Sequence, residues 1–207
     1  MEQGIRLAGP AREIPLASKL QFLFGGFYSQ FGWVWFGFSS IHFRMLVLQT
    51  GSLRDAAGWG PALLVTAFPV VGLGMMAVGL RKGLRGLRLL RDGIPATGRV
   101  VQKETTNVKI NDIPVVAFTF EFKTVDGRTA RCVAKTHLTQ DLEGPEGEPL
   151  VYDPKDPSVA VLLDDLPGKP RISELGVART REGAVWPLLL VPVGTFLMHL
   201  AWTLLAR

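Results

Sequence analysis

The chain has 207 residues, of which 47% are hydrophobic and 20% are charged, and its formal net charge is +5. This composition fits neither a wholly soluble domain nor a bundle of membrane helices alone. Residues 96–178 contain ten basic and thirteen acidic side chains, so the basic excess lies near the apolar stretches. The charge distribution therefore argues against nucleic acid as a partner, because such a site needs cations clustered on one face of the domain.

Three apolar stretches are each about as long as the roughly 20 residues that an α-helix needs to cross a bilayer. They predict an α-helical membrane protein with three transmembrane helices and a small, mainly antiparallel all-β barrel or sandwich domain inserted between helices 2 and 3. The predicted order is a cytoplasmic N-terminal segment (1–20), transmembrane helices at 21–48 and 60–80, a basic juxtamembrane helix (81–92), a soluble β-domain (93–184) and a transmembrane helix at 185–205.

Small residues line one side of each of the first two apolar stretches. In the first stretch they are Gly25, Ser29 and Gly32; in the second, Gly60, Ala67 and Gly74 recur at heptad spacing. Small residues let helix backbones approach closely in lipid, where apolarity alone does not drive association. The two stripes predict helix-packing surfaces, either between copies of the chain or, as the favoured interpretation, within one chain.

The cores of the three stretches contain no Asp, Glu or Lys, which argues against a proton pump or ion transporter. Two histidines, His42 and His199, fall in the outer parts of the first and third stretches and could face each other. Such a pair could bind a metal or sense pH. Because no third ligand accompanies them, the favoured interpretation is a hydrogen bond between helices or a position at the interface.

Basic residues are concentrated at one end of each apolar stretch. By the positive-inside rule this asymmetry places the N-terminus and the β-domain in the cytoplasm, and predicts a multi-pass protein of the cell (inner) membrane. The densest run continues the second helix and is predicted to contact anionic lipid headgroups; it consists of Arg81, Lys82, Arg85, Arg88 and Arg91.

Residues 93–184 alternate between apolar and polar side chains in short runs. The run 115–122 turns Phe118, Phe120 and Phe122 to one face, and Asp126-Gly127 predicts a two-residue hairpin turn before the run 129–134. Further strands are expected at 98–103 and around 149–152 and 159–163. About five short antiparallel strands fit a small barrel or sandwich.

The segment Tyr152-Asp153-Pro154-Lys155-Asp156-Pro157 follows the fourth expected strand. Together with the basic helix end and the Asp126-Gly127 hairpin, it resembles the bacterial membrane-protein family known as domain of unknown function 3592. The resemblance covers residues 80–163 and the flanking apolar stretches. It implies a small membrane-tethered β-domain without an assigned activity.

Two groups of residues could carry chemistry. Four carboxylates could hold Ca²⁺ or Mg²⁺, although two successive Asp-Pro pairs favour turns; they are Asp153, Asp156, Asp164 and Asp165. Cys132, His137 and Asp141 could supply a nucleophile, a base and an orienting carboxylate, but Cys132 falls within a predicted strand and no oxyanion-hole pattern accompanies it. The sequence therefore predicts no catalytic, cofactor-binding or metal-binding residue.

The function expected from these features is that of a non-enzymatic integral membrane protein. It would present the β-domain at the membrane surface for protein–protein interaction or self-assembly, as a homo-oligomer or with a membrane-protein partner. The alternative is an accessory subunit of a membrane transport or channel complex, in which the small-residue stripes would pack against larger subunits.

Overall fold

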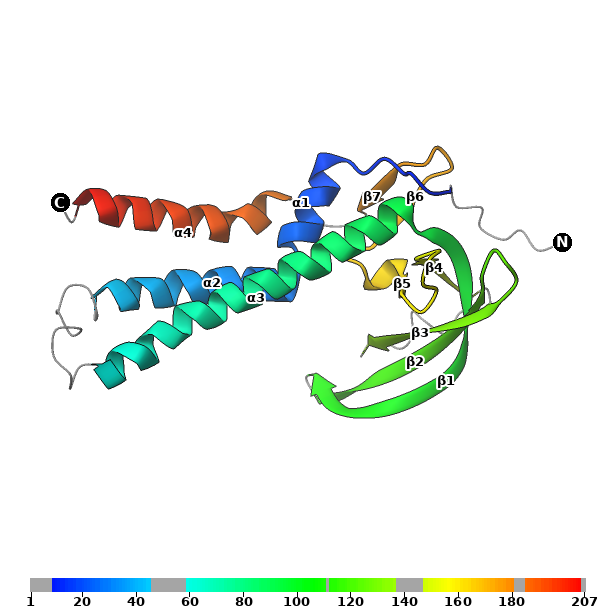
Figure 1. The fold of residues 1–207 in the computed structure, drawn as a ribbon, viewed down its shortest axis with the longest axis horizontal. Helices are drawn as coiled ribbons and strands as arrows, with labels where there is room; N and C mark the ends of the chain where they lie inside the picture. Colours follow the sequence, from blue (N-terminus) through cyan, green and yellow to red (C-terminus); the bar gives the residue numbers. More distant parts are fainter. Residues whose placement is uncertain (1–8, 46–58, 111, 137–146, 181–184, 206–207) are drawn as a thin grey trace. The chain divides into compact units, whose positions relative to one another are not determined.

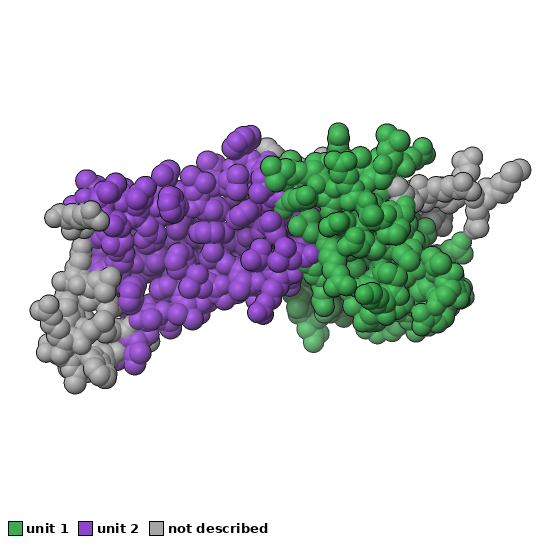
Figure 2. All heavy atoms as spheres, turned by 45° about the horizontal axis from the view of Figure 1, so that its top comes forward, with its two compact units in different colours: residues 1–19, 85–182 green, residues 20–84, 183–207 purple. Residues whose placement is uncertain are grey.

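The computed structural model describes residues 9–45, 59–110, 112–136, 147–180 and 185–205. The chain divides into two units, coloured separately in Figure 2. We call the first the β unit; it comprises Met1–Lys19 and Arg85–Glu182. The second, the helix unit, comprises Leu20–Leu84 and Gly183–Arg207.

The described part of the chain contains four α-helices: α1 (Leu16–Phe24), α2 (Phe27–Phe43), α3 (Trp59–Asp92) and α4 (Val185–Leu205). Two of these, α3 and α4, are long and apolar enough to cross a membrane. Of the most apolar 18 residues in each, only 11% in α3 and 6% in α4 are buried within the chain. A core helix of a soluble protein would instead be mostly buried, so the low burial of α3 and α4 suggests association with a membrane.

The predicted helix at 21–48 is not continuous, because it breaks at Gly25–Gly26. Gly26 has an extended backbone (φ −77°, ψ 148°), and glycine is a weak helix former. Side chains beyond the break bind the carbonyl oxygens at the end of α1: Ser29 Oγ donates to Leu23 O and Gln30 Nε2 donates to Phe24 O. The remaining α2 has 17 residues, about 25 Å at 1.5 Å per residue, so the structure does not clearly establish three transmembrane helices.

The basic run at 81–92 continues the second apolar helix, as expected from the sequence. Residues 60–80 and 81–92 both belong to α3, which runs without interruption to Asp92. Gly93 follows, and its N–H donates to Leu89 O, so the helix ends at a glycine that is followed closely by Pro95.

The β unit contains a five-stranded antiparallel sheet with strand order β3-β2-β1-β4-β5, shown in Figure 1. A separate hairpin is formed by β6 and β7. The strands are β1 (Ile94–Ile110), β2 (Ile113–Lys123), β3 (Thr129–Thr136), β4 (Glu148–Tyr152), β5 (Ala160–Leu162), β6 (Pro170–Ile172) and β7 (Ala178–Thr180). The hairpin turn predicted at Asp126-Gly127 is confirmed; Gly127 has φ +78°, a conformation that glycine adopts at low cost.

The five-stranded sheet has two halves, and β1 takes part in both of them. Its residues 94–98 pair with β4, and its residues from Arg99 onward pair with β2. Figure 1 shows the pronounced curve of β1 between these partners. Gly98 occupies the change of partner, where a β-carbon would lie 2.8 Å from Leu150 Cδ2 and 3.1 Å from the β-carbon of Phe120. The absence of a side chain therefore lets β1 pass close to the core.

The core of the β unit lies between these two halves. The predicted apolar face of β2 is confirmed, since Phe118 and Phe120 are fully buried and Phe122 is 2% exposed. They pack with residues of the other strands: Val116, Cys132, Ala134, Leu150, Tyr152 and Leu162. Within the described residues no backbone pairing joins β3 to β5, so the sheet is curved but is not a closed barrel.

The N-terminal segment is part of the β unit, which the sequence pattern did not predict. Glu13 forms a parallel bridge with Val177, and Ser18 Oγ accepts a hydrogen bond from Thr180 N at 3.1 Å. Arg12 is 3% exposed, and its Nη1 donates to Leu90 O (2.8 Å) and Gly93 O (2.9 Å) at the end of α3. A cation at a helix C-terminus is stabilised by the unpaired carbonyl groups there.

Candidate functional site

The small residues of α2 are packed against other helices of the same chain. A β-carbon at Gly32 would lie 2.8 Å from Met76 N, and one at Gly79 would lie 2.7 Å from Ser29 N. Ser29 is also buried, at 4% exposure. Gly25 stands at the break between α1 and α2, where its N–H donates to Gln21 O. Ser29 and Gly32 therefore lie where two helices of one chain approach closely.

A second close approach joins α2 to α4. A β-carbon at Gly37 would lie 2.6 Å from Thr195 Oγ1, and Thr195 is buried. Gln30 Nε2 donates to Leu188 O at 2.9 Å, which adds a polar bond between the same two helices. Contacts between small residues and a few interhelical hydrogen bonds are the interactions that hold helices together in lipid.

The stripe of α3 lies on a different face of that helix from the residues that contact α2. A β-carbon at Gly60 or Gly74 would have no atom within 4 Å, and Ala67 is exposed. Gly72 and Gly79, in contrast, contact α2 and are buried. The heptad positions predicted for packing thus form an open apolar face of α3, which we call the open α3 face (Gly60, Ala67 and Gly74).

The basic run at the end of α3 has two kinds of environment. Arg81 and Arg85 are exposed, and Lys82 Nζ lies 4.2 Å from the centre of the Tyr28 ring. Arg88 instead pairs with Asp153 at 3.3 Å, and Arg91 pairs with the neighbouring Asp92. Arg88 and Arg91 therefore have carboxylate partners within the β unit.

The two histidines of the helix unit make separate contacts. His199 Nε2 lies 2.7 Å from Ser40 Oγ, which links α4 to α2. His42 Nδ1 lies 2.8 Å from Phe38 O in its own helix. The described residues contain no group of three or more His, Cys, Asp or Glu side chains that could hold a metal ion. The favoured interpretation, a hydrogen bond between helices, therefore applies to His199.

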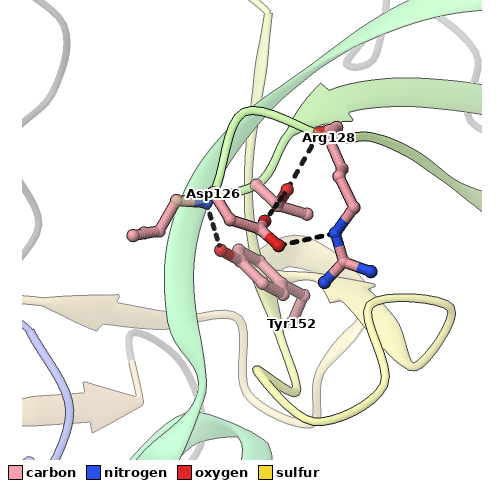
Figure 3. Close-up of polar contacts among 5 residues, drawn as sticks. Asp126, Arg128 and Tyr152 are labelled. Atoms are coloured by element: carbon pink, nitrogen blue, oxygen red, sulfur yellow. Dashed lines mark hydrogen bonds and ion pairs between the residues drawn. The ribbon is translucent and has the colours of Figure 1, made fainter.

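Tyr152 connects the Tyr-Asp-Pro segment to the core of the β unit. Its ring is 2% exposed and lies 5.2 Å from that of Phe122, centre to centre. Its hydroxyl accepts a hydrogen bond from Val125 N at 2.9 Å, in the turn between β2 and β3 (Figure 3). The residue thus ties the end of β4 to a turn that is distant in sequence.

The same turn is stabilised by Asp126. This carboxylate accepts hydrogen bonds from Thr124 Oγ1 and Arg128 Nε, as Figure 3 shows. The bond from Thr124, followed by that from Arg128, lowers the pKa of Asp126 from its ordinary value. These hydrogen bonds stabilise the hairpin turn.

The two Asp-Pro pairs form turns. Asp153 Oδ1 accepts from Lys155 N at 2.9 Å, and Asp156 Oδ1 accepts from Ser158 N at 3.1 Å. In each case the carboxylate binds the backbone two residues on, as expected of aspartate in a turn. The turn interpretation of Pro154 and Pro157 is therefore confirmed.

The sole cysteine lies in β3 beside the core and is 6% exposed. The other members of the considered catalytic group, His137 and Asp141, lie outside the described residues. Burial, with a smaller contribution from the negative charge of Asp165, raises the pKa of the Cys132 thiol to about 11. Since the thiolate is the reactive form, this position is unsuited to a nucleophile.

We expect Cys132 to alkylate at least about 100-fold more slowly in the folded protein than an exposed cysteine, because two pKa units remove about 99% of the thiolate. The rate can be measured with iodoacetamide at pH 8. A matched control is Val133→Cys in a Cys132→Ala chain, since Val133 is 60% exposed on the same strand. Equal rates for the two cysteines would contradict the buried placement.

No protein-family model, no curated protein and no solved structure matches the chain.

Proposed function

We propose that this chain is a non-enzymatic integral membrane protein that crosses the membrane three times, through α2, α3 and α4. It presents the β unit at the cytoplasmic surface for protein–protein interaction or self-assembly. The resemblance to the domain of unknown function 3592 family implies the same architecture.

The proposal rests mainly on which segments of the chain form the β unit. It combines residues that precede α1 with residues that follow α3, held together by Arg12 and by the bridge between Glu13 and Val177. Two segments on the same side of a membrane must be separated by an even number of crossings. If α3 crosses the membrane, α2 must cross it as well. The 17 residues of α2 are few for a complete span, and the apolar residues that flank α2 in the sequence would extend it.

The uncovered apolar surface of α3 and α4 supports insertion into a bilayer. Their exposed side chains include Val70 (60%), Val71 (52%), Leu190 (70%) and Phe196 (66%). At roughly 25 cal/mol per Å² of apolar surface, leaving two such helices in water costs far more than the stability of a small domain. The basic run at the end of α3 supports a cytoplasmic β unit by the positive-inside rule.

A second candidate function, that of an accessory subunit of a larger membrane complex, rests on the open α3 face. Gly60 and Gly74 leave room for another backbone at close range, and a foreign helix would fit there as well as a second copy. Purification in mild detergent separates the two functions. A discrete homo-oligomer supports self-assembly, and co-purifying transport or channel subunits support the accessory role.

The topology predicts which single cysteines an impermeant maleimide reaches in a Cys132→Ala chain. Leu175→Cys probes the β unit, where Leu175 is 91% exposed, and Leu205→Cys probes the end of α4, where Leu205 is 87% exposed. In sealed right-side-out vesicles we expect Leu205→Cys to label at once and Leu175→Cys to label only after permeabilisation. Labelling of Leu175→Cys in sealed vesicles would overturn the proposed orientation.

A further inference from the structure

The side-chain amide of Gln30 bonds two backbone carbonyl oxygens outside its own helix. Its Nε2 donates to Phe24 O at 2.6 Å and to Leu188 O at 2.9 Å. An amide nitrogen carries two hydrogens and a carbonyl oxygen only accepts, so both hydrogens are used. A single side chain of α2 thus connects the end of α1 to the first part of α4.

Both of these carbonyl groups lack the partner that a regular helix would give them. In an uninterrupted helix Leu188 O accepts from the N–H of residue 192, but this residue is Pro192, which has no N–H. Phe24 is the last residue of α1, and the last carbonyls of a helix have no partner within it. Inside a bilayer no water reaches such oxygens, so the protein itself must supply the donor. Gln30 supplies it to both.

Pro192 separates two parts of α4 that are attached to α2 in different ways. After Pro192, Thr195 is buried against Gly37, and His199 Nε2 lies 2.7 Å from Ser40 Oγ. Before Pro192, the bond from the Gln30 side chain to Leu188 O joins the two helices. A helix bends most easily at an internal proline, because one backbone hydrogen bond is missing there and the ring displaces the carbonyl four residues earlier.

We propose that α4 contains a hinge at Pro192 and that the Gln30 side chain is the latch of this hinge. With the latch bonded, residues 185–191 lie against α2. When the bond to Leu188 O breaks, these residues bend away, while the part of α4 after Pro192 stays packed on α2. The inference rests on the proposed insertion of α2 and α4 in the membrane, since in water the solvent would bond the carbonyl instead.

The first test is a double-mutant cycle. Gln30→Leu removes both bonds, and Pro192→Ala restores an N–H at residue 192, so that Leu188 O is bonded within α4. In the wild-type background Gln30→Leu is expected to lower the midpoint of thermal unfolding by about 2–4 °C, the shift that the loss of about one net hydrogen bond gives in a chain of this size. In the Pro192→Ala background the shift is expected to be smaller, because only Phe24 O then loses its donor. Equal shifts in the two backgrounds overturn the pairing of Gln30 with Pro192.

The second test measures the movement itself, with pairs of spin labels on a cysteine-free chain in lipid vesicles. One label is at Val34→Cys of α2, which is 51% exposed, and the other is at Leu190→Cys, which is 70% exposed and precedes Pro192. In the matched control pair the second label is at Leu197→Cys, which is 54% exposed and follows Pro192. Gln30→Leu is expected to lengthen and broaden the distance to residue 190 and to leave that to residue 197 unchanged. An unchanged distance to residue 190, or equal changes in both pairs, overturns the hinge.

Gln30→Glu keeps the size of the side chain and serves if Gln30→Leu does not fold. A protonated carboxyl group still donates one hydrogen bond, whereas a carboxylate only accepts. In this variant the distance between residues 34 and 190 is therefore expected to lengthen as the pH rises, and in wild type to stay constant; the same pH response in both chains contradicts the latch. Carbonate extraction is carried out on the same vesicles. Release of the protein defeats the proposed membrane function, whereas retention with unchanged distances defeats the hinge alone.

Discussion

Replacing Phe120 with alanine is expected to destabilise the β unit by about 3–5 kcal/mol, which is a large part of the stability of a small domain. Phe120 is fully buried between the two halves of the sheet, and its β-carbon faces Gly98 of β1. Truncation removes the transfer free energy of the ring and leaves a cavity that a β-sheet cannot easily close. Limited proteolysis and thermal unfolding of the full chain in detergent measure the loss.

Val133→Ala is the matched control for Phe120→Ala. Val133 lies on the neighbouring strand but is 60% exposed, on the opposite face of the same sheet. Its truncation is expected to change the free energy of unfolding by less than about 0.5 kcal/mol. Equal protease resistance of wild type and Phe120→Ala would show that the core of the β unit lies elsewhere.

Replacing Gly79 with leucine is expected to disrupt the helix unit. A β-carbon alone would lie 2.7 Å from Ser29 N and 2.9 Å from Ser29 Cα, so α2 and α3 must separate to admit any side chain. The contact atoms are backbone and cannot rotate away, which makes the cost at least the 1–3 kcal/mol typical of overpacking. Loss of monodisperse protein in size-exclusion chromatography, with loss of protease resistance, is the expected result.

Gly74→Leu is the matched control, since it makes the same change on the opposite side of α3. A β-carbon there meets nothing within 4 Å, and leucine is a better helix former than glycine, so the monomer is expected to fold normally. The same variant tests the proposed self-assembly. If copies meet through the open α3 face, Gly74→Leu lowers the oligomeric state measured by light scattering.

Normal folding of Gly79→Leu would contradict the close packing of α2 and α3. A wild-type oligomer size for a folded Gly74→Leu would remove the open α3 face as the seam between copies. The two outcomes are independent, because the two glycines lie on opposite faces of one helix.

Local patterns in the sequence predicted several elements well. The long apolar stretches predicted α3 and α4, and alternation predicted β2 with its buried phenylalanines. The Asp126-Gly127 pair predicted the hairpin turn, and the Asp-Pro pairs predicted the turns after β4. Each of these features depends on interactions among residues that are close in sequence, so a window of a few residues contains the necessary information.

The tertiary structure alone decided which surfaces meet. Both stripes consist of small residues, yet Gly32 is in close contact with α3, whereas a β-carbon at Gly74 would meet no atom within 4 Å. The role of Arg12 was also hidden, because its partners Leu90 and Gly93 are about 80 residues away and are backbone carbonyls that any residue supplies. Tyr152 likewise binds a backbone N–H in another turn. The sequence by itself thus determined which segments form helices and strands, through the spacing of their apolar residues. Which faces contact each other depends on segments that are distant in the sequence, and local composition does not encode those contacts.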